Sequence, residues 1–320
     1  MEVENILAKN ITMAGENAAY DAACKRLLAN KIILAWIMKS CIKEYNHLEV
    51  NEIADRYIEG NPQIGKTALH PDESEQIRGS NTEDSTISEG TVTYDIRFLA
   101  IVPNTSETIS LIINVEAQND FYPGYPIIKR GIYYCSRMIS SQYGVEFTNS
   151  HYENIKKVYS IWVCANPPQK RKNTINRYFI KEENLVGSAK EETENYDLIT
   201  AVVICLGHSE DDKYEGVLKL LDVLLSSEKA PEEKKQILQN DFDIKMTRTL
   251  ESEVQSMCNL SKGIEEKGIQ KGRQAGMIDG ILVSVKNLMD SMGWSAEQAM
   301  NVLKVSKEDQ EKYSALLKKQ

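Results

Sequence analysis

Two apolar runs in the middle of the chain each carry one carboxylate where a β-strand usually carries an apolar or neutral side chain. Asp95 lies inside the run from Val92 to Val102, and Glu116 lies inside the run from Ile109 to Ala117. Because removing a charge from water is costly, an ionised group enters a sheet only when it is paired or bound to a cation. The strand pair therefore predicts a hairpin with a divalent-metal site.

Strand periodicity extends this prediction to neighbouring residues. Side chains alternate between the faces of a strand, so Glu116 and Gln118 share a face, and Asp95 can lie across from it. Mg²⁺ prefers hard oxygen ligands and keeps several waters. Asp95, Glu116 and the backbone carbonyl of Ala117 would supply part of its shell, with Mn²⁺ as an alternative ion. Bound there, the ion would lower the pKa of a water that attacks phosphorus.

Spacing alone leaves a second interpretation open. An Asp and an E-x-Q in strands can also pair with Arg97 or Lys129 in a structural network.

The bulk composition, 42% hydrophobic and 27% charged over 320 residues, is that of a globular protein. No apolar run is long enough to span a membrane, so no membrane partner is expected. Six scattered cysteines without a C-x-x-C pair indicate a reducing, cytoplasmic location.

The charge distribution is uneven. The chain carries −9 in total, but the segment from Tyr125 to Lys181 has ten basic residues against two acidic ones, a local +8 that leaves −17 for the remainder. A basic, tyrosine-rich segment beside a metal site is a plausible footprint for a polyanion. An ordinary solvated surface is the alternative. The candidate nucleic-acid contacts are Lys129, Arg130, Tyr133, Arg137, Lys170, Arg171 and Lys172.

Periodicity and turn residues predict an α/β fold with a mixed sheet. Helices are expected at 18–47, 50–58, 127–142, 215–225 and 231–260. Strands are expected at 91–102, 108–117, 158–164, 177–180 and 198–206. Five glycines from Gly263 to Gly280 recur every four or five residues, which is typical of a marginal helix or a spacer. The last unit, 277–320, is expected to form short helices that dock or dimerise.

The sequence between Glu89 and Tyr143 includes TYDIRF and INVEAQNDFYPGYPIIKRGIYYCSRMISSQYG, with NTEDSTISEGT before them. With these motifs the chain resembles the PD-(D/E)XK nuclease superfamily, and most closely its transposase-associated, recombination-promoting nuclease branch. In the tail, MCNLSKGIEEKGIQKGRQAG and LMDSMGWSAEQAMNVLKVS are similar to the same branch.

The resemblance implies a restriction-endonuclease-like core, a mixed central sheet flanked by helices, in residues 1–210. A helical extension would follow at 211–262, and a Gly-periodic helix or linker with a small helical unit at 263–320. The implied function is a metal-dependent DNA endonuclease that hydrolyses phosphodiester bonds, linked to recombination or mobile elements. Double-stranded DNA is the expected partner, and the C-terminal helices are expected to support a homodimer.

The chain departs from the family pattern at Gln118, because lysine is commonest at that position. A glutamine has no charge, but its amide can orient a water by hydrogen bonding. Lys129 or Arg130 could supply the missing cation. A catalytically weak or silent DNA-binding or assembly module is therefore the alternative function. The family also implies a further acid before the hairpin, for which the candidates are Glu44, Glu52, Glu59, Glu83 and Glu89.

Overall fold

The structure is a computed structural model that describes residues 18–60, 63–64, 83–86, 90–103, 110–207, 214–226 and 229–317. Within these ranges only the backbone is described for 63–64, 83–86, 90–93, 110–120, 261–271 and 274–275. The chain divides into two compact units, the first ending at Ser261 and the second beginning at Lys262. The sequence-based boundary at residue 210 lies inside the first unit and stays a prediction.

The first unit is built on a six-stranded sheet with the strand order β1-β4-β5-β6-β8-β7. The strands are β1 (Gln63–Ile64), β4 (Ile96–Ile101), β5 (Ser110–Asp120), β6 (Val158–Asn166), β7 (Thr174–Phe179) and β8 (Ile199–Cys205). A separate two-stranded sheet pairs β2 (Glu83–Thr86) with β3 (Gly90–Thr93).

Strand direction confirms the predicted mixed sheet. β4 is antiparallel to both β1 and β5, whereas β5, β6 and β8 run parallel to one another. β7 returns antiparallel to β8 at one end of the sheet. The connection between β5 and β6 contains α4 (Ile127–Ser140), as parallel neighbours require. The fold is therefore mixed α/β.

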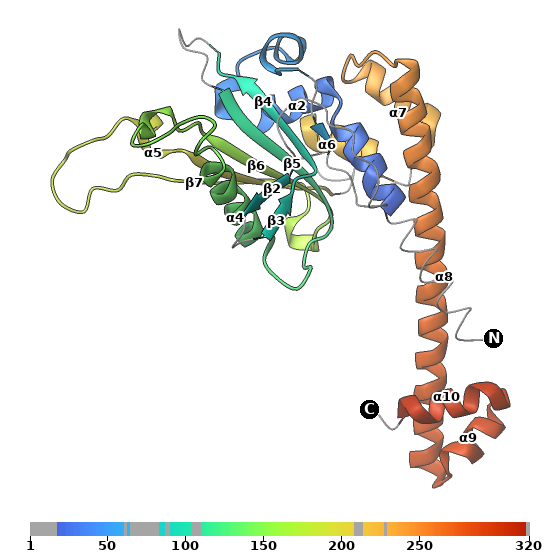
Figure 1. The fold of residues 1–320 in the computed structure, drawn as a ribbon. Helices are drawn as coiled ribbons and strands as arrows, with labels where there is room; N and C mark the ends of the chain where they lie inside the picture. The colour runs from blue at the N-terminus through green and yellow to red at the C-terminus, as the bar shows by residue number, and fades with distance from the viewer. Residues whose placement is uncertain are drawn as a thin grey trace. The chain divides into compact units, whose positions relative to one another are not determined.

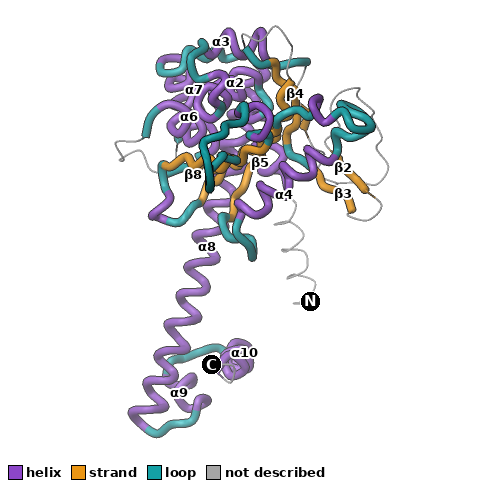
Figure 2. Tube along the Cα trace, turned by 90° about the vertical axis from the view of Figure 1, so that its left-hand side faces the viewer, coloured by secondary structure: helices purple, strands orange, loops and turns teal. Residues whose placement is uncertain are grey.

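The two faces of the sheet bury separate hydrophobic clusters. One face packs α4 against Trp162, Val203 and Cys205. The other face packs the helix at 18–28, α2 (Lys31–Cys41) and α6 (Gly216–Leu225) against strand residues such as Ile161 and Val202. Figures 1 and 2 show α4 on one side of the strands and α2 and α6 on the other. α7 (Pro231–Asn240) and the first turns of α8 (Arg248–Met292) complete the second cluster.

Several predicted elements are interrupted in the structure. The expected helix at 18–47 breaks at Asn30, whose side chain accepts a hydrogen bond from the Ile32 amide and caps α2. α3 (Val50–Glu52) and the π-helical turn η2 (Ile53–Tyr57) form the short second helix. The expected helix at 231–260 divides into α7 and α8, and Asp243 between them has a positive φ of 51°.

The strand expected at 91–102 also contains a break, and the break falls at Asp95. Tyr94 packs against α4 and Ile96 packs into the opposite cluster, although strand alternation would put both on one face. The chain therefore bends between β3 and β4. The prediction that Asp95 sits inside a strand was wrong: it lies immediately before β4.

The second unit contains the rest of α8, α9 (Ala296–Val302) and α10 (Lys307–Leu317). Its core is small, with Leu282, Val285, Met300 and Tyr313 among its buried members. Ser295 and Gln298 form a capping box that fixes the start of α9. The Gly-periodic segment is helical, since α8 runs through it without a break. No helix in the described ranges is long and apolar enough to cross a membrane.

A glycine after β8 provides a test of the packing at that end of the sheet. A Cβ added at Gly207 would lie 2.3 Å from Oδ1 of Asn173, which is buried and has a positive φ of 52°. We expect Gly207→Ala to lower the free energy of unfolding by about 1–3 kcal/mol. Gly276→Ala is the control, because nothing lies within 4 Å of its Cβ, and it should stabilise α8 by up to about 1 kcal/mol. Equal urea midpoints for both variants would contradict this packing.

Candidate functional site

The register of β4 and β5 relates the two carboxylates that the sequence singled out. Ile96 pairs with Val115, and this pair is the end of the β4–β5 ladder. Asp95 precedes Ile96 and Glu116 follows Val115, so both backbone positions adjoin the same cross-strand pair. The chain bends at Asp95, so the ladder does not extend to an Asp95–Glu116 pair. The predicted proximity of the two backbone positions is compatible with this arrangement.

Asp95 is bound by a lysine that sequence reasoning did not identify. Nζ of Lys25, in the helix at 18–28, lies 2.8 Å from Oδ1 of Asp95 and 2.6 Å from Oδ2 of Asp21. The Lys25 side chain is only 9% exposed, and that of Asp95 is 14% exposed. One ammonium thus joins two carboxylates, one from the first helix and one from the beginning of the hairpin.

The ion pairs fix the protonation state of this lysine. Burial by itself lowers the pKa of Lys25, but the charge of Asp95 and the hydrogen bonds to Asp21 and Asp95 outweigh it, so the pKa is raised above 10.5. Lys25 is therefore a permanent cation at neutral pH. Asp21 and Lys25 are spaced i, i+4, and that spacing within an apolar helix is the signal that the sequence offered for finding them.

Glu116, Ala117 and Gln118 all lie in β5, whose backbone is described and whose side chains are not. Glu116 is in register with Trp162 and Gln118 with Cys164 of β6. These positions pair with β6 on one side, whereas the pairing of β5 with β4 on the other side ends at Val115. The roles predicted for the three residues stay predictions.

The carboxyl ends of β5, β6 and β8 lie together, because the three strands are parallel. Asp95 precedes β4 at this same edge, since β4 runs opposite to β5. Loops at the carboxyl ends of parallel strands are the usual ligand-binding position of open α/β sheets. The β5–α4 and β6–β7 connections touch here: Cζ of Arg171 lies 5.4 Å from the centre of the Phe121 ring. These two connections thus lie at the same end of the parallel strands as Asp95.

The first turn of α4 carries Lys129 and Arg130 at this edge. Lys129 is exposed. The Arg130 guanidinium lies over the rings of Tyr134 and Trp162, at 5.0 and 5.1 Å from their centres. Its Nε donates to the Tyr134 hydroxyl at 3.0 Å, and Nη1 donates to the Tyr125 hydroxyl at 3.2 Å. Arg130 is thereby held in place rather than left as a mobile surface charge.

The remaining predicted contacts differ in exposure. Tyr133 is 45% exposed, whereas Arg137 is buried and donates from Nη1 to the Tyr133 hydroxyl at 3.2 Å. In the β6–β7 connection Lys170 is exposed, while Arg171 and Lys172 are half-buried. The Arg171 guanidinium packs on the Phe121 ring. The Arg171 Nε is buried without a hydrogen-bond acceptor in the described part of the chain.

The proposed additional acids do not gather near Asp95 among the residues described. Glu44 accepts hydrogen bonds from Lys157, at 3.4 Å, and from the Tyr159 hydroxyl, at 2.8 Å, near the amino end of β6. Glu52 pairs with Arg56 within its own helical turn, at 3.3 Å. Glu59 is exposed. The Glu83 side chain and the whole of Glu89 lie outside the described residues.

Neither a cluster of metal-ligating side chains nor a comparison with known proteins identifies the site. Among the side chains that the structure describes, no group of three or more His, Cys, Asp or Glu residues could hold a metal ion. Glu116 is not among those side chains. The chain matches no family model, no curated protein and no solved structure.

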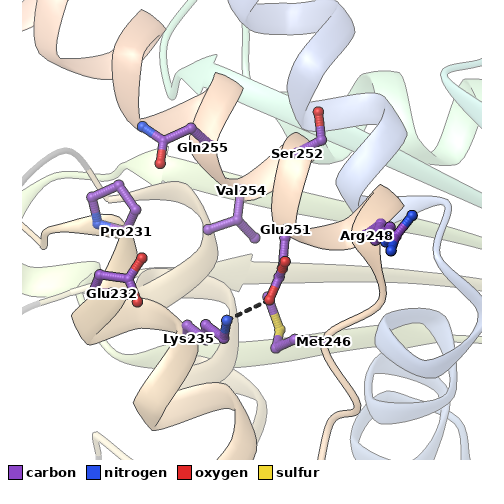
Figure 3. A pocket seen from close by; sticks show the side chains of 9 residues that line it. All are labelled: Pro231, Glu232, Lys235, Met246, Arg248, Glu251, Ser252, Val254 and Gln255. Atoms are coloured by element: carbon purple, nitrogen blue, oxygen red, sulfur yellow. Dashed lines mark ion pairs between the residues drawn. The ribbon is translucent and has the colours of Figure 1, made fainter.

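A hollow of about 390 Å³ lies elsewhere in the first unit, between α7 and the start of α8 (Figure 3). Lys235 and Glu251 form an ion pair across it, and Arg248 lies beside them. None of the candidate residues lines this hollow. Lys235 and Glu251 are paired with each other, and we assign no function to this hollow.

Proposed function

We propose that this protein is a divalent-metal-dependent nuclease that hydrolyses phosphodiester bonds of double-stranded DNA, with the PD-(D/E)XK type of core. The observation that supports the proposal most is the β4–β5 register, in which Ile96 pairs with Val115, so that Asp95 and Glu116 each adjoin the same cross-strand pair. The element order agrees with that core: a helix, an antiparallel hairpin, a crossover helix and a parallel strand.

The donor set fits a hard cation. Asp95 and Glu116 would hold Mg²⁺ or Mn²⁺ with the Ala117 carbonyl, all of them oxygen donors. When bound, the ion would activate a water and neutralise charge that develops on the phosphate. Asp95 keeps 14% of its side chain exposed, so it is accessible from solvent.

Lys25 adds a cation that the motif itself lacks. Gln118 occupies the position where the family commonly has lysine, and it would orient a water through its amide. The Lys25 ammonium, 2.8 Å from Asp95, would interact with an anionic substrate from the opposite side of that carboxylate. It replaces Lys129 and Arg130 as the cation closest to Asp95 in our proposal. Arg130 and Arg171 would then contact the DNA backbone nearby.

The same ion pair favours a second candidate function. Lys25 already compensates the charge of Asp95, so that carboxylate needs no metal to be tolerated in the fold. A DNA-binding or assembly module without catalysis is consistent with this arrangement. Such a module would bind DNA in a salt-dependent manner and leave it intact.

Incubation with supercoiled plasmid separates the two functions. The nuclease predicts nicked plasmid with Mg²⁺ or Mn²⁺ and intact plasmid with EDTA. The binding module predicts retarded but uncut plasmid under both conditions. Absence of both cutting and retardation would reject both.

DNA binding by the basic β6–β7 connection can be tested separately from cleavage. We expect Lys170→Ala to weaken DNA binding in EDTA and to lower the slope of log K against log salt by about one unit, since one phosphate contact is lost. Lys286→Ala in α8 is the control, because it lies in the second unit. A slope unchanged in Lys170→Ala would remove the β6–β7 connection from the DNA contact surface.

A further inference from the structure

The exposed edge of the sheet is β7. It lies at the end of the strand order and pairs with β8 alone among the described strands. From Ile175 to Phe179 every side chain is exposed, on both faces of the strand. Large apolar residues dominate the stretch: Ile175 is 36% exposed, Tyr178 37%, Phe179 48% and Ile180 43%. An apolar edge of this kind is a template for another strand.

The usual protections of an edge strand are weak in β7. It contains no proline and a single charged residue, Arg177, whose guanidinium lies over the Phe179 ring at 4.8 Å. Beyond β7 the chain forms an exposed arm, in which the Glu182 carboxylate accepts from the Glu191 amide at 3.3 Å and Asn184 donates to the Ala189 carbonyl. The arm does not cover the strand, since Ile175 to Phe179 stay exposed.

The sign of the charged residues changes just after β7, between Lys181 and Glu182. The residues up to Lys181 are basic, with Lys170, Lys172 and Arg177 among them and no acid from 170 to 181. The base of the arm is acidic. Its carboxylates are Glu182, Glu183, Glu191 and Glu192. Along the chain the basic residues precede the acidic ones, and an antiparallel copy presents them in the reverse order. The acidic residues of one copy therefore lie toward the basic segment of the other.

We propose that β7 is a self-association edge, where two copies of the chain pair their β7 strands antiparallel across a two-fold axis. The partner is therefore a second copy of this protein. Such an axis places one residue of β7 opposite the same residue of the second copy. Centring on Arg177 opposes two arginines, and centring on Phe179 opposes Arg177 to Lys181; both arrangements are destabilising.

Centring the axis on Tyr178 avoids these repulsions. Arg177 then faces the partner's Phe179, and Thr174 faces the partner's Glu182, which brings each basic end beside an acidic arm. The two sheets become one continuous sheet without a free β7 edge. This inference does not rest on the nuclease activity, and it differs from a dimer made through the C-terminal helices.

Disulfide trapping in the full chain tests the register. In the dimer, Tyr178→Cys brings two Cα atoms to about 4.5–5.5 Å, within disulfide range, whereas Arg177→Cys leaves them beyond about 7 Å. All six native cysteines are free and buried, so the background is low. We expect diamide to crosslink Tyr178→Cys into a dimer on a non-reducing gel and to leave Arg177→Cys monomeric. Equal crosslinking of the two, or none in either, would overturn the register.

Sedimentation of the full chain tests the association itself. We expect a dimer whose dissociation constant rises about fivefold or more in Tyr178→Asp, which opposes two like charges at the axis, relative to the neutral control Tyr178→Asn. A wild-type chain that stays monomeric at every concentration would overturn the proposal. So would a dimer that is equally tight in both variants, because its interface would lie elsewhere.

Discussion

Asp95→Asn and Glu116→Gln are each expected to lower Mg²⁺-dependent nicking of plasmid DNA by at least about a hundredfold. Each substitution keeps the size of the side chain and removes one anionic oxygen donor, which a hard cation requires. Initial rates of conversion from supercoiled to nicked plasmid provide the measurement. Cleavage at the wild-type rate in either variant would contradict the proposed site.

An exposed acid outside the site supplies the matched control for this experiment. Asp55 lies in η2 with its side chain exposed, and Asp55→Asn makes the same chemical change. We expect its nicking rate to equal that of the wild-type chain. A loss as large as that of Asp95→Asn would show that the rate responds to total charge and not to the β4–β5 position.

Lys25→Met is expected to lower the free energy of unfolding by about 2–4 kcal/mol in EDTA. Removing the ammonium leaves Asp21 and Asp95 close together without their shared cation. The cost falls below that of a fully buried pair, because the Asp21 side chain is 35% exposed and that of Asp95 is 14% exposed. Urea unfolding monitored by circular dichroism measures the difference.

If Asp95 is a metal ligand, Mg²⁺ should restore part of the free energy of unfolding that Lys25→Met loses. An ion that binds only the native state stabilises it by mass action, and in Lys25→Met the lysine no longer competes for Asp95. The double variant Lys25→Met with Asp95→Asn is the control and should not respond to Mg²⁺. A Lys25→Met chain that Mg²⁺ leaves unchanged would favour a purely structural ion pair.

The pH dependence of the same free energy follows from the raised pKa of Lys25. A lysine whose folded-state pKa exceeds its unfolded value stabilises the fold fully below the unfolded pKa. The stabilisation is lost as the pH rises through the folded pKa. The difference between wild type and Lys25→Met should therefore be constant from about pH 7 to 9 and shrink above about pH 10.5. A difference that shrinks between about pH 5 and 7 instead would assign the effect to another group.

Much of the central sheet could be predicted from local patterns. The strands β6 and β8 are buried on both faces, and each is therefore a continuous apolar run that the sequence alone predicts as a strand. α4 was predicted to within two residues at its end, because Pro126 precedes its first turn and its apolar residues recur at helical spacing.

The break at Asp95 could not be predicted in the same way. It depends on Tyr94 packing against Tyr134 of α4 and on Lys25 reaching Asp95 from a helix 70 residues earlier in the chain. Both are tertiary contacts, and local propensity does not encode them. For the same reason Lys129 and Arg130 were the cations predicted from sequence, although Lys25 is the lysine that contacts Asp95.

Binding of Mn²⁺ measured by electron paramagnetic resonance tests the central claim most directly, because it requires neither turnover nor DNA. We expect one Mn²⁺ site per chain in the wild type, strongly weakened in both Asp95→Asn and Glu116→Gln and retained in Asp55→Asn. Mn²⁺ binding that is the same in all four chains, or absent from the wild type, would contradict a metal site shared by Asp95 and Glu116.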